Sequence, residues 1–465
     1  MTNRHLQRCI KTADPKSGPF KPRPFLFNLI FICAISMGGW LLPFSYVLSA
    51  SDTTTIQSLT TSSDEEISFE VYKTDNTDVT LRILWIAPGF GIDPRHRQTA
   101  EALAKQGVEV WLVDLADALF LMKGATSMRE ISGQLVADLI NALTDYNNDH
   151  AEVLIVSSTY GAIPSIRGIH AWQSQKEKSP GLLGAVFFSP SLFSHVPELG
   201  LTPSFIPELA ATNAPLYIFQ EENNGNRWHL PAALNELKHS PIYVELLKGV
   251  MSVFYRKDTT PNTMKTFKAA PNMILRAAKQ LRHHTMPLVA LPLPVTKDTT
   301  NNSGLNTQLK PYRGDIAPSP IRLHDASGKL FDIRDYRGKV TVINFWATWC
   351  PPCVEEIPSL NRLKQAMQDK SFQLISINYA EPAEKIHDFL TQVNVDFPVL
   401  LDPGGKLTGQ WKVLAFPSTF VIGPDGNIQF GVNAGIHWDT DEVIQQLKAL
   451  LPNREPLKPA IPKTE

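Results

Sequence analysis

The chain has 465 residues, a formal net charge of −1 at pH 7 and 43% hydrophobic residues. This length is sufficient for two domains with complete cores, and the near-neutral charge gives no reason to expect a nucleic-acid partner. Only four cysteines are present, which excludes a dense disulfide framework.

The N-terminus combines a basic leader with an apolar segment. Residues 1–24 carry six Lys and Arg side chains against one acid: Arg4, Arg8, Lys11, Lys16, Lys21, Arg23 and Asp14. Residues 25–48 are about long enough to cross a bilayer as a helix. Basic residues hold an N-terminus in the cytoplasm, so we predict a single-pass signal anchor in the inner membrane, with the following domains in the periplasm. A signal peptide cleaved after Ser49 or Ala50 is the alternative.

Three polar segments separate the remaining parts of the chain. Residues 49–65 are rich in Ser, Thr and Asp and are predicted to form a flexible stalk. Residues 286–311 are predicted to be an interdomain linker and residues 452–465, with four prolines, a disordered tail. These boundaries leave two domains, at 66–285 and 312–451.

The first domain alternates short apolar runs with helical patterns. Strands are expected at Ile67–Tyr72, Leu81–Ile86, Val108–Val113, Val153–Val156, Ala185–Phe188, Leu216–Gln220 and Tyr243–Leu247. Helices are expected at Arg95–Gln106, Met128–Tyr146, Leu230–Lys238 and Thr263–His283. This alternation predicts an α/β fold with a mostly parallel, doubly wound sheet.

Two loops in this domain resemble α/β-hydrolases. Residues 87–91 (APGFG) resemble the oxyanion loop, and residues 157–161 (SSTYG) fall where the G-x-S-x-G elbow belongs. Thr159 stands at the nucleophile position, and Ser157 replaces the first elbow glycine. The resemblance therefore implies the fold, with a changed nucleophile.

The acid and base of a hydrolase triad are not evident. Asn224 stands where the acid would align, with Glu221 or Glu222 as alternatives, and Ser252 lies where the base histidine would follow the last strand. Without an imidazole to take its proton, a threonine hydroxyl is a poor nucleophile.

Two later histidines are poor candidates for the missing base. His283 and His284 come some thirty residues late, where surface histidines are more common than a relocated base. We predict a hydrolase-shaped scaffold lacking the triad, and a working esterase is the alternative.

The sequence pattern of the second domain also predicts an α/β fold. Strands are expected at Val340–Phe345, Gln373–Asn378, Val399–Leu401, Ser418–Ile422 and Ile428–Val432, the last two joined by a turn at residues 424–426. A helix after the first strand is expected to bury Val354, Ile357, Leu360, Leu363 and Met367.

Two cysteines stand where this first strand meets its helix. Cys350 and Cys353 enclose two prolines, a spacing that lets both sulfurs share the first helical turn and form a disulfide. The helix N-terminus favours a thiolate on Cys350, which would attack, while Cys353 would resolve. A structural disulfide and half of a zinc site are the alternatives, but no second cysteine pair exists to complete a zinc site.

From Asn344 through Leu360 the chain resembles the TlpA/ResA-like thioredoxins, which are membrane-tethered, extracytoplasmic thiol-disulfide oxidoreductases. The resemblance runs from about residue 312 to 451. It implies a cis-proline at Pro417, whose neighbours Phe416 and Ser418, together with Trp349, would contact substrate. An ordinary trans-proline is the alternative.

The same resemblance assigns a proton acceptor. Ordinary thioredoxin has an aspartate on the strand where this chain has Asn344, whereas the TlpA/ResA-like proteins use a glutamate three residues after the second cysteine. That position is Glu356, and its neighbour Glu355 is expected to be exposed. The alternative is that Glu356 is a surface residue without a role.

The sequence thus predicts an extracytoplasmic oxidoreductase acting on protein thiols and disulfides through a CPPC dithiol, with no metal or organic cofactor. The resemblance implies reduction rather than oxidation and a membrane electron donor of the DsbD/CcdA type. The sequence leaves open whether the substrate is an apocytochrome, as in cytochrome c maturation, an envelope protein or a dedicated partner. Two alternatives stay open: a bifunctional hydrolase and redox enzyme, and a binding protein whose first domain presents substrate to the dithiol.

Overall fold

The computed structural model describes residues 10–12, 54–196, 198–201, 203–294 and 308–452. The predicted anchor at 25–48 lies outside these ranges, as do most of the predicted leader and of the tail. Among the helices within them, none combines the length and apolar character needed to cross a bilayer.

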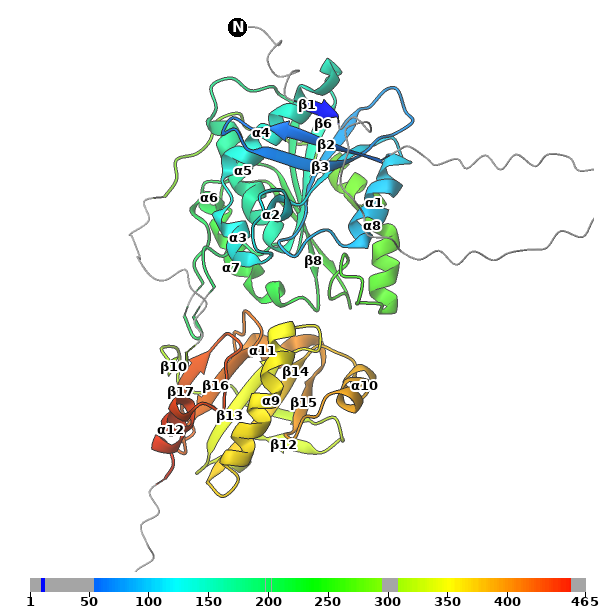
Figure 1. The fold of residues 1–465 in the computed structure, drawn as a ribbon. Helices are drawn as coiled ribbons and strands as arrows, with labels where there is room; N and C mark the ends of the chain where they lie inside the picture. Colours follow the sequence, from blue (N-terminus) through cyan, green and yellow to red (C-terminus); the bar gives the residue numbers. More distant parts are fainter. Residues whose placement is uncertain (1–9, 13–53, 197, 202, 295–307, 453–465) are drawn as a thin grey trace, which may run out of the picture.

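The N-terminal domain is built on a nine-stranded sheet of order β1-β2-β3-β5-β4-β6-β7-β8-β9 (Figure 1). β4 to β9 are parallel, whereas β1, β2 and β3 pair antiparallel with their neighbours. The strands are β1 (Ile10–Thr12), β2 (Thr54–Thr60), β3 (Glu66–Tyr72), β4 (Leu81–Ile86), β5 (Glu109–Val113), β6 (Glu152–Ser158), β7 (Leu182–Phe188), β8 (Leu216–Glu221) and β9 (Ile242–Leu247). The prediction of a mostly parallel α/β sheet is confirmed.

Helices cover both faces of this sheet. They are α1 (Pro94–Ala104), α2 (Leu115–Ala118), α3 (Ala125–Glu130), α4 (Gly133–Thr144), α5 (Ala162–Ser174), α6 (Pro207–Ala210), α7 (Leu230–Glu236) and α8 (Pro261–Leu281). α4 and α5 pack on the face that includes Leu84 and Ile86, and α1 and α8 pack on the face of Ile83 and Trp85. A central strand buried on both sides explains why β4 is apolar at every position except Arg82, which is itself buried.

The C-terminal domain has a mixed six-stranded sheet of order β10-β17-β16-β13-β14-β15 and a separate β11–β12 hairpin. Its strands are β10 (Lys310–Pro311), β11 (Arg322–His324), β12 (Leu330–Asp332), β13 (Val340–Trp346), β14 (Phe372–Tyr379), β15 (Val399–Asp402), β16 (Ser418–Ile422) and β17 (Ile428–Val432). The helices α9 (Pro351–Ala366), α10 (Ala383–Gln392) and α12 (Asp441–Ala449) pack on one face, and α11 (Lys406–Gln410) on the other. α9 crosses the front of this sheet in Figure 1.

The predicted stalk is wrong over residues 54–60, which form β2. Alternate side chains there, Gln57 and Leu59, are buried against the domain. Thr is β-branched and favours extended backbone, so a Ser/Thr-rich stretch with this alternation can complete a sheet.

β1 also departs from the prediction. Residues 10–12, within the predicted leader, form a short strand that pairs antiparallel with β2.

The predicted linker is shorter than expected. Its first part returns to the N-terminal domain, where His170 and Gln173 of α5 bond the carbonyl groups of Leu291 and Pro287 at 2.9 and 2.7 Å. Its last two residues form β10. The segment between, residues 295–307, lies outside the described residues.

The two domains meet through loops at one edge of the N-terminal sheet. These loops follow the carboxyl ends of β7, β8 and β9, and Figure 1 shows the C-terminal domain placed below that edge. Leu199, from the loop after β7, lies in the core cluster of the C-terminal domain. The hydroxyl of Tyr379 donates to the Asn223 carbonyl, in the loop after β8, at 2.6 Å.

Candidate redox site

Cys350 and Cys353 form a disulfide at the start of α9. Their Cα atoms are 5.3 Å apart and their sulfurs 2.06 Å apart. Cys350 is the N-cap residue of the helix, and Pro351 follows at its first position, where a proline needs no hydrogen-bond partner. Both cysteines are nearly buried, Cys350 at 4% exposed and Cys353 at 1%. The helix dipole therefore favours a thiolate on Cys350 after reduction.

Glu356 lies one helical turn after Cys353 and is only 3% exposed, which excludes the surface alternative. Its carboxylate accepts hydrogen bonds from Asn344 Nδ2 at 2.7 Å, Trp438 Nε1 at 3.0 Å and the Ile436 N–H at 3.4 Å. Burial opposes ionisation and outweighs these donors, so the pKa of Glu356 is raised to about 7. Residues three apart share one helix face, so this carboxyl is placed to exchange protons near Cys353 at neutral pH.

The loop before β16 lies beside the disulfide. The Phe416–Pro417 peptide bond is cis, as the resemblance implied. The ring of Phe416 contacts Trp349 edge-on, with centroids 5.8 Å apart, and Tyr379 at 5.0 Å. The Ser418 hydroxyl turns back to the Ala415 carbonyl at 2.7 Å, so it closes the loop and does not face a substrate.

Sequence reasoning missed Glu381, which anchors the segment before the dithiol. Its carboxylate accepts from the Thr348 N–H at 2.7 Å, the Thr348 hydroxyl at 2.6 Å and Asn378 Nδ2 at 2.8 Å. Lys385 closes the group with an ion pair at 2.6 Å. The sequence offered one signal for this role, because Glu381 is a carboxylate just after a buried strand, at the sheet edge where the dithiol lies.

The C-terminal domain is similar to known proteins. Residues 313–430 match the AhpC/TSA family. This region is a thioredoxin-like domain of the AhpC/TSA type.

The matching proteins include thiol-disulfide oxidoreductases. Over 115 residues the chain is 34% identical to ResA of Bacillus thuringiensis subsp. konkukian, covering 25% of this chain and 66% of that protein, just under two thirds. ResA of Geobacillus thermodenitrificans is 29% identical over 139 residues, which are 30% of this chain and 78% of that protein. A solved structure, a secreted Mycobacterium tuberculosis disulfide oxidoreductase homologous to E. coli DsbE, is 26% identical, with 28% and 96% coverage and a TM-score of 0.25.

Beyond the thioredoxin-like domain, the structure places Thr159 at a sharp turn between β6 and α5. Its φ is +46°, a left-handed value that β-branched residues rarely adopt, and its hydroxyl oxygen is buried without a hydrogen-bond partner. Gly161 packs so closely that an added Cβ would lie 2.9 Å from the carbonyl oxygens of Ile86 and Ala87. The turn between β6 and α5 is therefore strained at Thr159 and tightly packed at Gly161.

The predicted acid and base positions are brought together, but not as a catalytic pair. Asn224 Nδ2 donates to Glu221 at 3.0 Å and to the Met251 carbonyl at 3.2 Å. Glu221 in turn accepts from the Val253 N–H at 2.6 Å, and the Ser252 N–H is bonded to Asp258 at 3.3 Å. Burial raises the pKa of Glu221 to about 7. These groups tie two loops together, and no hydrogen bond links them to the Thr159 hydroxyl.

Histidine placement agrees with a missing base. His284 Nε2 is bonded to the Tyr243 hydroxyl at 2.7 Å, and Tyr243 lies at the opposite, amino-terminal end of β9. Sequence reasoning passed over His229, which is buried beside Phe193, with ring centroids 5.0 Å apart. Burial lowers the pKa of His229 to about 4, which makes it a weak base.

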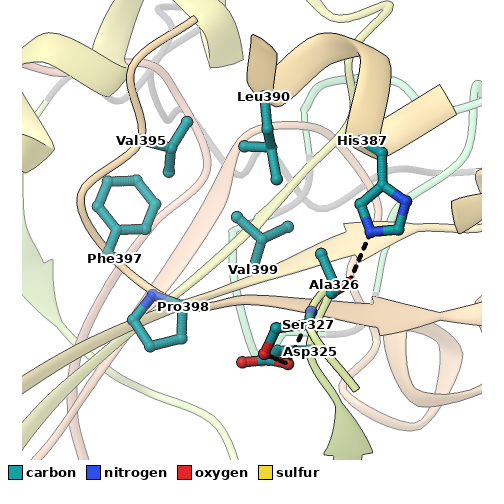
Figure 2. A pocket seen from close by; sticks show the side chains of 9 residues that line it. All are labelled: Asp325, Ala326, Ser327, His387, Leu390, Val395, Phe397, Pro398 and Val399. Carbon is teal, nitrogen blue, oxygen red and sulfur yellow. Dashed lines mark hydrogen bonds between the residues drawn. The ribbon is translucent and has the colours of Figure 1, made fainter. Parts of the chain in front are cut away.

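A shallow cavity of about 370 Å³ opens elsewhere on the thioredoxin-like domain, between the β11–β12 turn, α10 and the start of β15 (Figure 2). Its floor is apolar, formed by residues such as Leu390, Phe397 and Val399, and His387 at its rim is bonded to the Ala326 carbonyl at 2.6 Å. None of the predicted site residues lines it. The cavity and the dithiol are separate features.

Proposed function

We propose that the chain is an extracytoplasmic thiol-disulfide oxidoreductase that reduces disulfides in other polypeptides. The observation that carries this proposal is the Cys350–Cys353 pair at a helix N-terminus, with the buried, protonatable Glu356 one turn further along. The similarity to ResA proteins, which are thiol-disulfide oxidoreductases by name, supports the same chemistry.

The proposed reaction transfers two electrons from the dithiol to the substrate. The Cys350 thiolate attacks one sulfur of a substrate disulfide, forms a mixed disulfide and releases the other substrate sulfur as a thiolate. Cys353 then passes its proton to the Glu356 carboxylate and attacks Cys350, which releases the second substrate thiolate and closes the Cys350–Cys353 disulfide. A reductant of the dithiol class must restore the cysteines, and a DsbD/CcdA-type membrane donor fits that need.

Single-cysteine variants test this proposal. Cys350→Ser should abolish the acceleration by this chain of insulin and peptide-disulfide reduction by dithiothreitol, leaving the rate of dithiothreitol alone, because the attacking thiolate is lost. Cys353→Ser should attack once and stall as a mixed disulfide that a mass measurement detects. If both variants trapped substrate equally, the assignment of attacker and resolver would be wrong.

The proposed location depends on residues 1–48. The basic leader and apolar segment support an inner-membrane anchor with both domains in the periplasm, and the pairing of β1 with β2 is the observation against it. A reporter active only in the periplasm, fused after Glu465, should be active, and the chain should stay in the membrane after a carbonate wash. A soluble chain beginning near Ser51 would instead mean cleavage.

For the N-terminal domain we propose a hydrolase-like scaffold without a working triad. The positive φ of Thr159 supports the elbow resemblance, while the hydrogen bonds of Asn224 and Glu221 to backbone groups support a structural use of the former acid and base positions.

A further inference from the structure

Among the described residues, three loops at one edge of the N-terminal sheet contact the thioredoxin-like domain, and they follow β7, β8 and β9. The predicted acid and base positions, Asn224 and Ser252, lie in the second and third of these loops. From the first loop, Leu199 packs against Gly431, where an added Cβ would lie 3.1 Å from its methyl carbon. From the third loop, Tyr255 lies close enough to Glu381 for that carboxylate to reinforce the rise in the Tyr255 pKa that burial causes. The redox domain thus covers the edge where a hydrolase would admit its substrate.

The second loop, residues 223–228, reaches the substrate side of the dithiol, and we name it the docking loop. Tyr379 donates its hydroxyl to the Asn223 carbonyl while its ring rests on Phe416, the residue before the cis-proline. Gly225 also faces the Phe416 ring, since an added Cβ would lie 3.9 Å from it. One side of the cis-proline loop is therefore covered by the other domain.

The far end of the docking loop is wedged against α11. The ring of Trp228 lies over Gly409, where an added Cβ would come within 2.3 Å of two ring carbons. The Arg227 guanidinium lies over the Trp228 ring, 5.0 Å from its centroid. Only a glycine at 409 permits this contact, because any side chain would displace the indole.

The docking loop is also held firmly within its own domain. Asn224 bonds Glu221 and the Met251 carbonyl, and Asn226 Nδ2 donates to the Ser189 carbonyl at 2.8 Å. The Asn223 N–H bonds the Val250 carbonyl at 2.8 Å. This set of partly buried hydrogen bonds fixes the conformation of the docking loop.

We propose that the docking loop is a specificity wall that restricts the dithiol to disulfides in extended, locally unfolded polypeptide segments. The inference rests on the proposed function and deepens it. A substrate strand pairs with the backbone beside a cis-proline. The docking loop covers one side of Phe416 through Gly225 and the Asn223–Tyr379 bond, so an extended chain has the remaining side for its approach, whereas the loop obstructs a bulky folded protein. The wall therefore excludes bulky substrates without touching the reacting sulfurs.

Two variants of the full chain disrupt the contact between Trp228 and Gly409, one from each side of it. Trp228→Ala removes the indole, and Gly409→Ala displaces it while keeping a helix-compatible residue in α11. With dithiothreitol as reductant, we expect both to raise the rate of reduction of native insulin by about fivefold or more, and to change the rate with a linear peptide disulfide less than about twofold. Agreement between two unrelated changes separates the wall from a folding defect.

A conservative pair supplies the matched control. Tyr379→Phe removes only the hydroxyl bond to Asn223, and Tyr243→Phe removes a comparable bond to His284 away from the domain contact. Tyr379→Phe should raise the insulin-to-peptide rate ratio, and Tyr243→Phe should leave it unchanged.

An unchanged ratio of insulin to peptide reduction rates in both Trp228→Ala and Gly409→Ala would contradict the proposal. A parallel fall of both rates would also contradict it, because the docking loop would then support the dithiol itself. Either result leaves the proposed function intact. If the folded wild-type chain reduced neither insulin nor the peptide, the proposed function would fail, and the wall with it.

Discussion

Glu356 in the thioredoxin-like domain and Glu221 in the N-terminal domain are physically similar but differ in what lies beside them. Both are nearly buried, at 3% and 2% exposed, and burial raises the pKa of each to about 7. Each also accepts hydrogen bonds from an asparagine side chain and a backbone N–H. Glu356 lies one turn from a reactive cysteine, whereas Glu221 is bonded to the loops that form the domain contact.

The comparison shows that a raised carboxyl pKa is a consequence of burial before it is a sign of catalysis. A perturbed acid becomes catalytic only where a group that gains or loses a proton lies within reach. We propose that Glu356 meets this condition through Cys353. Glu221 is bonded to Asn224 and to the Val253 N–H, which do not titrate, so we expect its protonation to affect only the stability of the fold.

The largest expected effect is that of Glu356→Gln. The rate of mixed-disulfide resolution in the wild type should rise with pH through about 7, because only the carboxylate can accept the Cys353 proton. Glu356→Gln should slow resolution by about 100-fold and remove that inflection. Stopped-flow fluorescence of mixed-disulfide decay measures it. Glu355→Gln makes the same change one residue earlier, on an exposed side chain, and should leave the profile unaltered.

Asn344→Asp should move the inflection without removing it. The new carboxyl would lie where the Asn344 amide now donates to Glu356 at 2.7 Å. Glu356 would lose a hydrogen-bond donor and gain a neighbouring negative charge, so its pKa should rise. The inflection in the resolution rate should therefore shift upward by about one pH unit. The same decay assay over pH 5 to about 9.5 follows it. An unmoved or lowered inflection would separate Glu356 from the observed pH dependence.

Glu221→Gln should change stability but not redox activity. The folded pKa of about 7 exceeds the value of 4.5 for the free group, so between these pH values the folded state holds more protons than the unfolded state. Stability then falls as pH rises through this window, by at most about 1.4 kcal/mol per pH unit for one such group. Urea denaturation at several pH values should show a smaller decline for Glu221→Gln. Glu222→Gln, on the half-exposed neighbour, is the control.

The smallest expected effect is at Thr159. A fluorophosphonate probe should leave it unlabelled, and Thr159→Ser should not restore labelling, because Asn224 and Ser252 supply neither an acid nor a base. Labelling of the unmodified chain at Thr159, Ser157 or Ser158, identified by peptide mass, would support the bifunctional alternative.

Local patterns were sufficient to predict the dithiol and most of the sheet. The spacing of Cys350 and Cys353 after an apolar strand placed both at the start of α9, and the strands of both domains coincide closely with the apolar runs. β2 was missed because polarity was taken to mean disorder, although its threonines favour extended backbone.

Features that depend on distant parts of the chain could not be predicted in this way. Glu381 anchors Thr348 across 33 residues, and the docking loop meets Phe416 from another domain. Each of these residues is unremarkable in its own segment. Only the fold brings their partners to them.

Arg95 holds the backbone of the loop after β9 in one conformation. Its buried guanidinium donates to the carbonyl groups of Val253, Tyr255 and Asp258 at 3.1, 3.0 and 2.8 Å, in the loop where a base histidine would be expected. A histidine introduced there would sit on a backbone already committed to another shape. We therefore expect that a histidine introduced at position 252 alone would not supply a working base, because Arg95 already fixes the backbone of this loop.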